Sequence, residues 1–309
     1  MGGSIVVVGS LNADLWVRLD RHPLPGETVR GETAITLPGG KGANQAVAAA
    51  NLGARVAMVG AVGRDAHADV ALSLLRASGV DLTHVREVDG PTGLAIVSVD
   101  RAGENSIVVV GGANERVDAA FVESAAVAIA AAGIVVLQGE IPASGTAEAV
   151  ELATGRIILN LAPVVPLPPE ILRSANPLVV NEHEGALALG LLRGANTAPS
   201  GSDMADHAAI VLGLLAEGVP TVVMTLGAAG ALVGEGPAAP LVHLPAPHVH
   251  VVDSTGAGDA FVGALAQRLA DGESLVAASR FAARVGAFAC TRRGAQPSYP
   301  TADDVLPDV

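Results

Sequence analysis

The chain has 309 residues, half of them apolar, and its formal net charge is −13. Only 16% of the residues are charged, which is too few for a disordered chain, and a single cysteine excludes an internal disulfide framework and a cysteine-based zinc site. The acidic balance argues against nucleic-acid binding, and the apolar run at residues 5–9 is too short to span a membrane. We therefore expect a cytoplasmic protein without a nucleic-acid or membrane partner.

Short β-branched runs alternate along the chain with stretches rich in Ala and Leu. The predicted buried strands are residues 5–9, 56–60, 134–137, 157–160, 178–181 and 221–226. The predicted helices include residues 44–52, 66–78, 119–131, 206–217 and 259–270. This alternation predicts a mostly parallel sheet with helices on both faces, a three-layer α/β/α sandwich. Ligands of such a sheet bind outside the carboxyl ends of its strands.

Two stretches interrupt this alternation. Residues 11–38 lack a helical period, and residues 92–112 have the pattern of a hairpin. The parts of the predicted hairpin are strands 94–99 and 106–110 and a turn at 100–103. Both stretches suggest strands outside the main sheet, which form either a lid over the site or an ordinary extension of the sheet edge. We expect a single domain, residues 1–309, with lid strands inserted from about 11–38 and 92–112.

The most informative segment is residues 252–261, in which a strand ends, a glycine-rich turn follows and a helix begins near Asp259. Such a turn presents main-chain N–H groups at the positive end of the helix dipole, where they suit an anion whose charge grows during a reaction. Asp259 would then accept a proton from a hydroxyl nucleophile. The alternative is that Asp259 is only a favourable charge at a helix N-terminus.

A second glycine-rich segment, residues 38–46, combines three glycines with Lys41 and Asn44 ahead of an Ala-rich helix. Glycines allow the backbone to approach a polar ligand closely, although the spacing is not that of a phosphate-binding P-loop. The alternative is a plain turn with Asn44 near a helix cap.

Two further segments follow predicted strands. Asn181 and Glu184 would share a face at a helix start, where they either hold a hydrated Mg²⁺ or form a capping box, which the pattern alone favours. The stretch 225–230 either covers a nucleotide phosphate or is a tight turn. His248 and His250 alternate on a predicted strand, but without a third ligand they make a poor metal site and are expected to be structural.

Taken together, these segments resemble the PfkB-type carbohydrate kinase family over nearly the whole chain. The matching segments are residues 9–14, 25–28, 39–46, 103–105, 112–114, 181 with 184, 225–227, 253–259 and 294–298. The resemblance implies a sandwich fold with a small β-sheet lid and ATP-dependent phosphorylation of a sugar. Segments 39–46 and 294–298 are most similar to the members that phosphorylate the 5-hydroxyl of D-ribose. Deoxyribose, another sugar or a nucleoside remain alternative substrates, and a non-catalytic regulator that binds sugar or nucleotide is an alternative of another class.

The resemblance also implies roles for individual residues. Asp259 would be the catalytic base, and the main-chain amides of Gly256, Ala257 and Gly258 would form the anion hole. Besides Asp259, the sugar-binding positions are Asn12, Asp14, Gly40, Lys41, Gly42, Ala43, Asn44 and Glu140. Besides Asp259, the ATP-binding positions are Asn181, Thr225, Leu226, Gly227, Ala228, Ala229, Gly230 and Gly258.

Two metal ions are implied in the same way. Glu184 would help to place Mg²⁺, and a K⁺ ion would stiffen the turn that carries the anion hole. The implied potassium positions are Asp253, Thr255, Ala289, Arg292, Gly294 and Ser298, which would act mostly through main-chain carbonyls. One departure from the family pattern is Ala283, which stands where a polar neighbour of the adenine is common and leaves the preference among nucleotide donors open. A homodimer through the lid strands is also implied, because an open sheet edge invites pairing.

Overall fold

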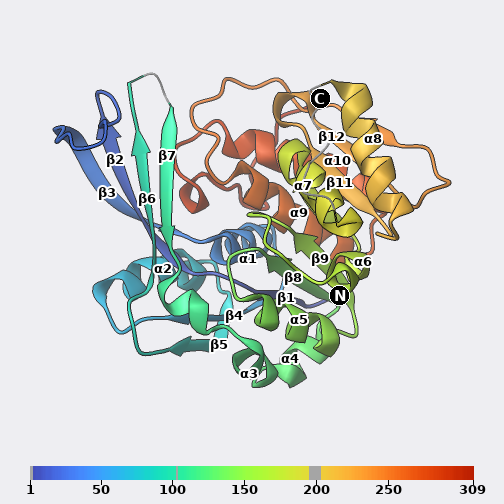
Figure 1. Ribbon diagram of the computed structural model, residues 1–309, viewed down its shortest axis with the longest axis horizontal. Helices are drawn as coiled ribbons and strands as arrows, with labels where there is room; N and C mark the ends of the chain where they lie inside the picture. The colour runs from blue at the N-terminus through green and yellow to red at the C-terminus, as the bar shows by residue number, and fades with distance from the viewer. Residues whose placement is uncertain (1–2, 102–103, 195–202) are drawn as a thin grey trace.

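The computed structural model describes residues 3–101, 104–194 and 203–309, and within them the main sheet has nine strands (Figure 1). Its strand order is β13-β12-β11-β10-β9-β8-β1-β4-β5. The strands are β1 (Ile5–Val8), β4 (Val56–Val62), β5 (Asp81–Glu87), β8 (Ile134–Gln138), β9 (Arg156–Asn160), β10 (Leu178–Asn181), β11 (Val222–Thr225), β12 (Ala231–Gly234) and β13 (Val242–Leu244). Pairing is parallel from β5 to β11 and antiparallel at β12 and β13, which confirms the predicted mostly parallel sheet.

Helices cover both faces of this sheet, because its central strands are apolar on both sides. In β1, Ile5 and Val7 face one core cluster, whereas Val6 and Val8 face the other. The helices on the first face are α1 (Lys41–Asn51), α2 (Ala66–Ala77), α9 (Ala257–Ala270) and α10 (Leu275–Ala289). Those on the second face are α3 (Ala119–Glu123), α4 (Ala126–Ala131), α5 (Ala143–Leu152), α6 (Pro169–Ser174), α7 (Glu182–Arg193) and α8 (Met204–Ala216). The predicted three-layer sandwich is therefore confirmed.

Several element boundaries differ from the prediction. The helix predicted over 119–131 is two helices, α3 and α4, because the chain leaves helical geometry at Ala125 and the Ser124 hydroxyl donates instead to the Phe121 carbonyl at 2.5 Å. The helix predicted from residue 44 begins at Lys41, directly after Gly40, whose φ of 87° ends the preceding strand. Within the described residues no helix is long and apolar enough to cross a membrane.

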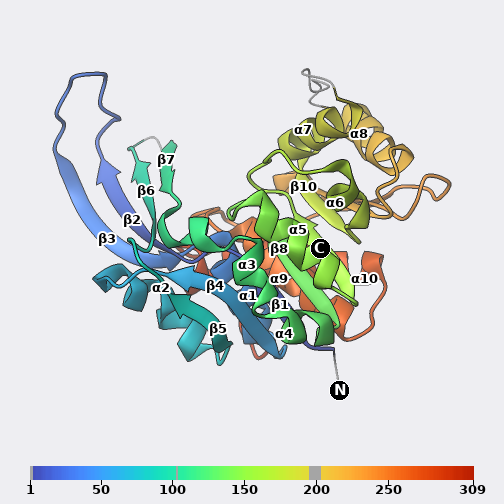
Figure 2. The ribbon, with the colours of Figure 1, turned by 60° about the horizontal axis from the view of Figure 1, so that its bottom comes forward.

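A separate sheet of four described strands projects from the body of the molecule (Figure 2). Its order is β3-β2-β6-β7, with bounds β3 (Gly31–Gly39), β2 (Asn12–Leu19), β6 (Gly93–Val99) and β7 (Asn105–Val110). Its strands come from the two stretches that the sequence set apart. Residues 102–103, which belong to the predicted turn and to the matching segment 103–105, lie outside the described residues.

Close approaches at glycines bring the site-bearing elements together. A Cβ at Gly42 would lie 2.6 Å from the main-chain nitrogen of Ser10, so the start of α1 rests directly on the connection between β1 and β2. A Cβ at Gly263 would lie 2.6 Å from both the Cβ of Ala48 and the carbonyl oxygen of Gln45, so α9 and α1 pack backbone to backbone. These contacts hold the N-terminal turns of α1 and α9 next to each other at the carboxyl edge of the sheet.

We expect Gly263→Ala to lower the free energy of unfolding by about 1–3 kcal/mol, because the added methyl collides with main-chain atoms of α1. Urea unfolding monitored by circular dichroism measures the change. The control is Gly3→Ala, since a Cβ at Gly3 meets no atom closer than 3.6 Å. An unchanged midpoint for Gly263→Ala would contradict the tight packing of the two helices.

Candidate active site

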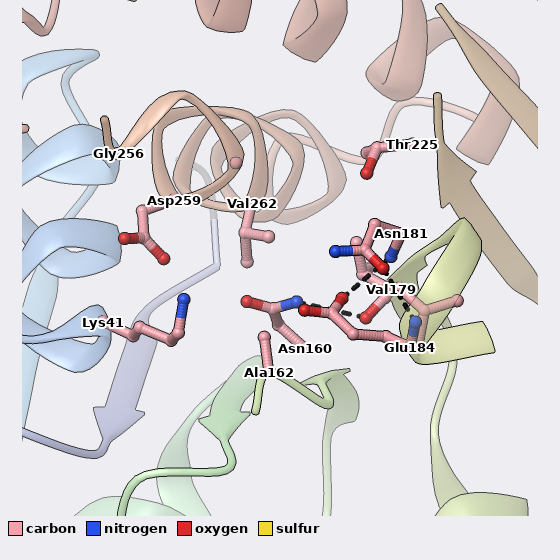
Figure 3. A pocket seen from close by; sticks show the side chains of 12 residues that line it. Lys41, Asn160, Ala162, Val179, Asn181, Glu184, Thr225, Gly256, Asp259 and Val262 are labelled. Carbon is pink, nitrogen blue, oxygen red and sulfur yellow. Dashed lines mark hydrogen bonds between the residues drawn. The ribbon is translucent and has the colours of Figure 1, made fainter. Parts of the chain in front are cut away.

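A cavity of about 170 Å³ lies at the carboxyl ends of β9, β10 and β11 (Figure 3). The starts of α1, α7 and α9 close it. Its lining residues are Lys41, Asn160, Ala162, Val179, Val180, Asn181, Glu184, Thr225, Gly256, Gly258, Asp259 and Val262. The structure thus brings together residues from four segments that the sequence singled out, at the edge of the sheet where ligands were expected.

Asp259, the third residue of α9, is only 6% exposed. The Nδ2 of Asn44 donates to its Oδ2 at 2.8 Å, and the Nε2 of Gln45 donates to its Oδ1 at 2.9 Å. Lys41 and Asp259 point toward one another in the cavity (Figure 3). The negative charge of Asp259 is the main cause that raises the pKa of Lys41, so the ammonium stays charged. A buried carboxylate with a hydrogen bond to each oxygen and a cation nearby is suited to accept a proton at a fixed position.

The turn before α9 is held by the last segment of the chain. Gly256 has a φ of 72°, and the Tyr299 hydroxyl donates to its carbonyl oxygen at 3.0 Å. The N–H of Ala257 donates to the Ser254 carbonyl at 3.2 Å, so this amide of the predicted anion hole is engaged within the turn. Gly256 and Gly258 line the cavity, and a Cβ at Gly258 would meet no atom within 4 Å. The opening toward an anion therefore lies at Gly258.

The predicted sugar-binding residues Asn12 and Asp14 lie on β2, which pairs with β3 directly before α1. Neither lines one of the cavities, but Asp14 is close enough to Lys41 and Asp259 for their charges to act on its pKa. The Oδ1 of Asn12 accepts a hydrogen bond from Asn114 at 2.7 Å, whereas the Oδ1 of Asp14 is buried without a partner among the described residues. Glu140 accepts from the Ser10 hydroxyl at 2.6 Å and from the main-chain N–H of Lys41 at 3.0 Å. Glu140 thus accepts from an N–H at the start of α1 that has no partner within the helix. Gly40, Gly42 and Ala43 supply main chain at the same place.

Asp14 sits among other carboxylates. Burial, followed by the charges of Glu140 and Asp259, raises its pKa from 3.8 to about 7, and Lys41 opposes this shift. The same burial leaves Oδ1 of Asp14 without a hydrogen-bond partner among the described residues. A ligand with hydroxyl groups would supply such donors.

A second cavity, of about 480 Å³, shares Asn181, Thr225 and Gly258 with the first. Its other lining residues are Glu182, Gly227, Ala228, Gly230, Ala246, Pro247, His248, Val249, Val251, Ser254, Ala257, Phe261, Ala283, Gly286, Ala287 and Cys290. Most predicted ATP-binding residues therefore line one continuous space. Leu226 is instead buried in the core, and Ala229 is outside the lining, where its carbonyl is bonded to the His243 ring at 2.7 Å.

The strand predicted around His248 and His250 is wrong, because residues 245–251 form no regular structure. His248 lines the second cavity, and both His248 and His250 are exposed, so neither imidazole belongs to the core.

Asn181 and Glu184 form the capping box that the pattern favoured. The Glu184 N–H donates to Asn181 Oδ1 at 2.7 Å, and the Asn181 N–H donates to Glu184 Oε2 at 2.8 Å. Both residues also line the first cavity, and burial raises the pKa of Glu184. No group of three His, Cys, Asp or Glu side chains that could hold a metal ion exists among the described residues. The donors present fit a Mg²⁺ ion held by one carboxylate and otherwise by water and phosphate oxygens.

The segments with the predicted potassium positions are joined by hydrogen bonds. Asp253 accepts from the N–H of Thr255 at 2.9 Å and from the N–H of Gly294 at 2.8 Å. The Ser298 hydroxyl donates to the Ala295 carbonyl at 2.7 Å, and the Arg292 guanidinium lies 4.4 Å from the centre of the Phe288 ring. These bonds hold the loop next to the turn before α9, and the main-chain carbonyls that the resemblance implies as potassium ligands belong to the same segments. Ala289 is the last residue of α10, and this helix ends next to the loop.

No role was predicted for the buried amides behind Asp259, namely Gln45, Gln138, Asn160 and Gln296, although Gln45 and Gln296 lie within the matching segments 39–46 and 294–298. A signal was present: Gln138 and Asn160 are the last residues of β8 and β9, where polar side chains at strand ends mark a site.

Comparison with known proteins agrees with this geometry. Residues 3–302 match the family described as pfkB family carbohydrate kinase. The ribokinase of Schizosaccharomyces pombe is 37% identical, with 96% of this chain and 95% of that protein covered. The deoxyribokinase of Salmonella typhi is 33% identical, with 96% and 95% covered. The structure of Arabidopsis thaliana ribokinase complexed with ribose and ATP has a TM-score of 0.83 and 35% identity, with 98% of this chain and 97% of that chain covered.

The raised pKa of Asp14 predicts a pH-dependent stability in the absence of ligand. The unfolded state releases this proton near pH 3.8 and the folded state only near pH 7, so stability falls as the pH rises between these values. Relative to the parent protein, Asp14→Asn should gain stability over this window, on the order of 1–3 kcal/mol once partial exposure is allowed for. Urea unfolding at pH 4, 6 and 8 measures it, with Asp303→Asn as the exposed control. A constant difference between Asp14→Asn and the parent at all three pH values would contradict the shift.

Proposed function

The chain belongs to the pfkB family of carbohydrate kinases, and from this premise we propose that it is an ATP-dependent ribokinase that converts D-ribose to ribose 5-phosphate. The observation that carries the proposal is the position of Asp259. It lies at the N-terminus of α9 in a small polar cavity that opens into a larger, mostly apolar one. Gly258, one residue before Asp259, lines both cavities, so a nucleotide phosphate in the larger one can reach a sugar hydroxyl held beside Asp259.

In the proposed reaction, Asp259 removes the proton from the 5-hydroxyl of ribose as that oxygen attacks the γ-phosphorus of ATP. The new P–O bond forms while the bond to the bridging oxygen of ADP breaks, and ADP carries away the electron pair. The N–H groups of Gly256 and Gly258, at the positive end of α9, stabilise the charge on the transferring phosphoryl group. Positioning and charge stabilisation supply most of the rate in such transfers.

The proposed sugar site is built from β2, the start of α1 and Glu140. Asn12, Asp14, Asn44 and Glu140 offer oxygens and an amide to the sugar hydroxyls, and Lys41 offers a cation. Three carboxylates, those of Asp14, Glu140 and Asp259, repel a substrate that already carries a phosphate, so a free sugar is favoured over a sugar phosphate.

The larger cavity is the proposed ATP site. The turn at 227–230 and the small side chains of α10, including Ala283, Gly286 and Ala287, leave room for a flat base. When bound, Mg²⁺ near Glu184 would offset phosphate charge, and K⁺ in the loop of Asp253 would stiffen the turn of the anion hole.

The four-strand sheet is proposed to act as a lid on the sugar within a single domain, residues 1–309. Its edge strand β7 exposes four apolar side chains in a row, Ile107 to Val110, each about half exposed. An unpaired apolar edge of this kind supports the proposal that two copies pair through their lid strands.

The deciding experiment is a coupled assay of ADP release with D-ribose, 2-deoxyribose, other free sugars and nucleosides, each in K⁺ and in Na⁺ medium. Ribose is expected to give the highest kcat/KM, and K⁺ is expected to raise the rate. A higher kcat/KM for deoxyribose or a nucleoside would show that ribose is not the preferred substrate. Binding of sugar or nucleotide without any turnover would favour a regulator.

Asp259→Asn should lower kcat by about 10³-fold or more, because an amide cannot accept the hydroxyl proton. The variant should stay folded because the side-chain volume is preserved, but its unfolding midpoint should fall somewhat, since one oxygen that accepts from Asn44 or Gln45 becomes an NH₂ group. The exposed Asp303→Asn is the control and should behave like the parent. If kcat stays within a factor of about ten of the parent value, Asp259 is not the base.

Trp16, the single tryptophan, lies on β2 between Ile35 of β3 and Val97 of β6. If the sheet closes over the sugar, the environment of this side chain changes. Ribose should therefore shift the tryptophan emission with saturation, and Asp14→Asn should move the midpoint to higher ribose concentration. Unchanged emission at saturating ribose would contradict closure at this strand.

A further inference from the structure

The chain contains four glutamines, and all four are buried. Three of them, Gln45, Gln138 and Gln296, belong to one hydrogen-bond network that ends on the Asp259 carboxylate. Gln138 donates to Gln45 at 2.9 Å, and Gln45 donates to Asp259 at 2.9 Å. On the other side, Gln296 donates to Asn44 at 2.9 Å, and Asn44 donates to Asp259 at 2.8 Å. The carboxylate is thus held by two arms, each two amides long.

The side-chain amide of Gln45 has partners at both its nitrogen and its oxygen. One N–H of its Nε2 bonds to Asp259 and the other to the Oδ1 of Asn160, 2.9 Å away, while its Oε1 accepts from Gln138. An amide group has two N–H donors, and both are used. Turning the amide over would place its oxygen against two acceptors, so its orientation is determined by its partners.

The direction of both arms follows from the charge at their end. A carboxylate accepts and never donates, so each amide in contact with it must present its NH₂ group. The oxygens of Asn44 and Gln45 then face outward and require donors, which Gln296 and Gln138 provide. At the outer end, the Oε1 atoms of Gln138 and Gln296 are buried without a partner among the described residues. Two unpartnered carbonyls are an unfavourable arrangement that the chain tolerates only if the inner bonds matter more.

We propose that Gln45, Gln138 and Gln296 are positioning residues that orient the Asp259 carboxylate, so that one lone pair of each oxygen is engaged and the other faces the substrate hydroxyl. This rests on the proposed function of Asp259 as the base. Neither cavity is lined by any of these three glutamines, so they act through the carboxylate and not on the substrates. Three other charged groups also act on Asp259, namely Lys41 of α1, Asp14 of β2 and Glu184 of α7. Among the described residues, none of the three forms a hydrogen bond with the Asp259 carboxylate.

The first test separates kcat from KM. Gln138→Met preserves the size of the side chain and removes the donor to Gln45, and it should lower kcat about tenfold while the KM for sugar changes less than about twofold. The matched control is Gln267→Met: Gln267 is also buried, lies on the same helix as Asp259 and donates to Asp271, away from both cavities. It should leave kcat unchanged. Equal kcat for Gln138→Met and the parent, or an equal loss in the control, would overturn the proposal.

Gln138→Glu adds a test of direction. Its ionised carboxylate has the shape of the glutamine but accepts instead of donating, so it opposes the Gln45 oxygen and should lower kcat more than Gln138→Met does at high pH. At low pH the buried carboxyl is protonated and can donate to Gln45, so this deficit should shrink. If the role were only to fill space, the variant of the same shape would be the milder one. Thermal unfolding establishes that each variant is folded, and if Gln138→Glu is not, Gln138→Met decides alone.

The second test does not depend on activity. Glutamine labelled with ¹⁵N at the side chain gives four NH₂ signals, which single substitutions assign. Asp259→Asn should shift the signals of Gln45, Gln138 and Gln296 and leave that of Gln267 in place. Unmoved signals for Gln138 and Gln296 would overturn the network. If the signals move but the parent protein phosphorylates no sugar, the network stands and the proposed function fails.

Discussion

The structure depends on burying one carboxylate, that of Asp259, between two helices. An ionised group removed from water is costly unless donors replace its hydration. Here the replacement comes from the amides of Asn44 and Gln45 and from the N-terminus of α9 itself, whose unpaired N–H groups favour negative charge. The packing of α1 against α9 therefore serves the site directly, since it carries the donors to the acceptor.

This packing needs residues without side chains at the contact points. Gly42 lets α1 rest on the chain after β1, and Gly263 lets α9 touch α1. At Gly256, the positive φ turns the chain into α9, and the Tyr299 hydroxyl secures the carbonyl. The glycines of the site thus have distinct physical tasks: two allow close approach between helices and strands, and one supplies a backbone conformation that other residues avoid.

Much of this arrangement could be predicted from the sequence, because its signals are local. The β-branched runs predicted the parallel strands, and the glycine turn before Asp259 predicted a helix N-terminus directed at a ligand. Ambiguity remained where one pattern serves two purposes, as with Asn181 and Glu184, which form a capping box and also line the cavity. The amide network could not be predicted, since Gln45, Gln138 and Gln296 are far apart in the chain and only the fold shows that they share one acceptor. The strands β12 and β13 were missed because they are short, and β5 because only Leu82 and Val85 of its seven residues are apolar.

The two cavities have Asn181, Thr225 and Gly258 in common. Under the proposed function, a single compound that tethers a ribose mimic to an adenosine through a short linker would occupy the sugar and nucleotide sites together, and its two halves would raise each other's effective concentration. Such a linker would pass the three shared residues, so its length, more than either half alone, would set the selectivity of a bisubstrate inhibitor for this protein over other nucleotide-dependent enzymes.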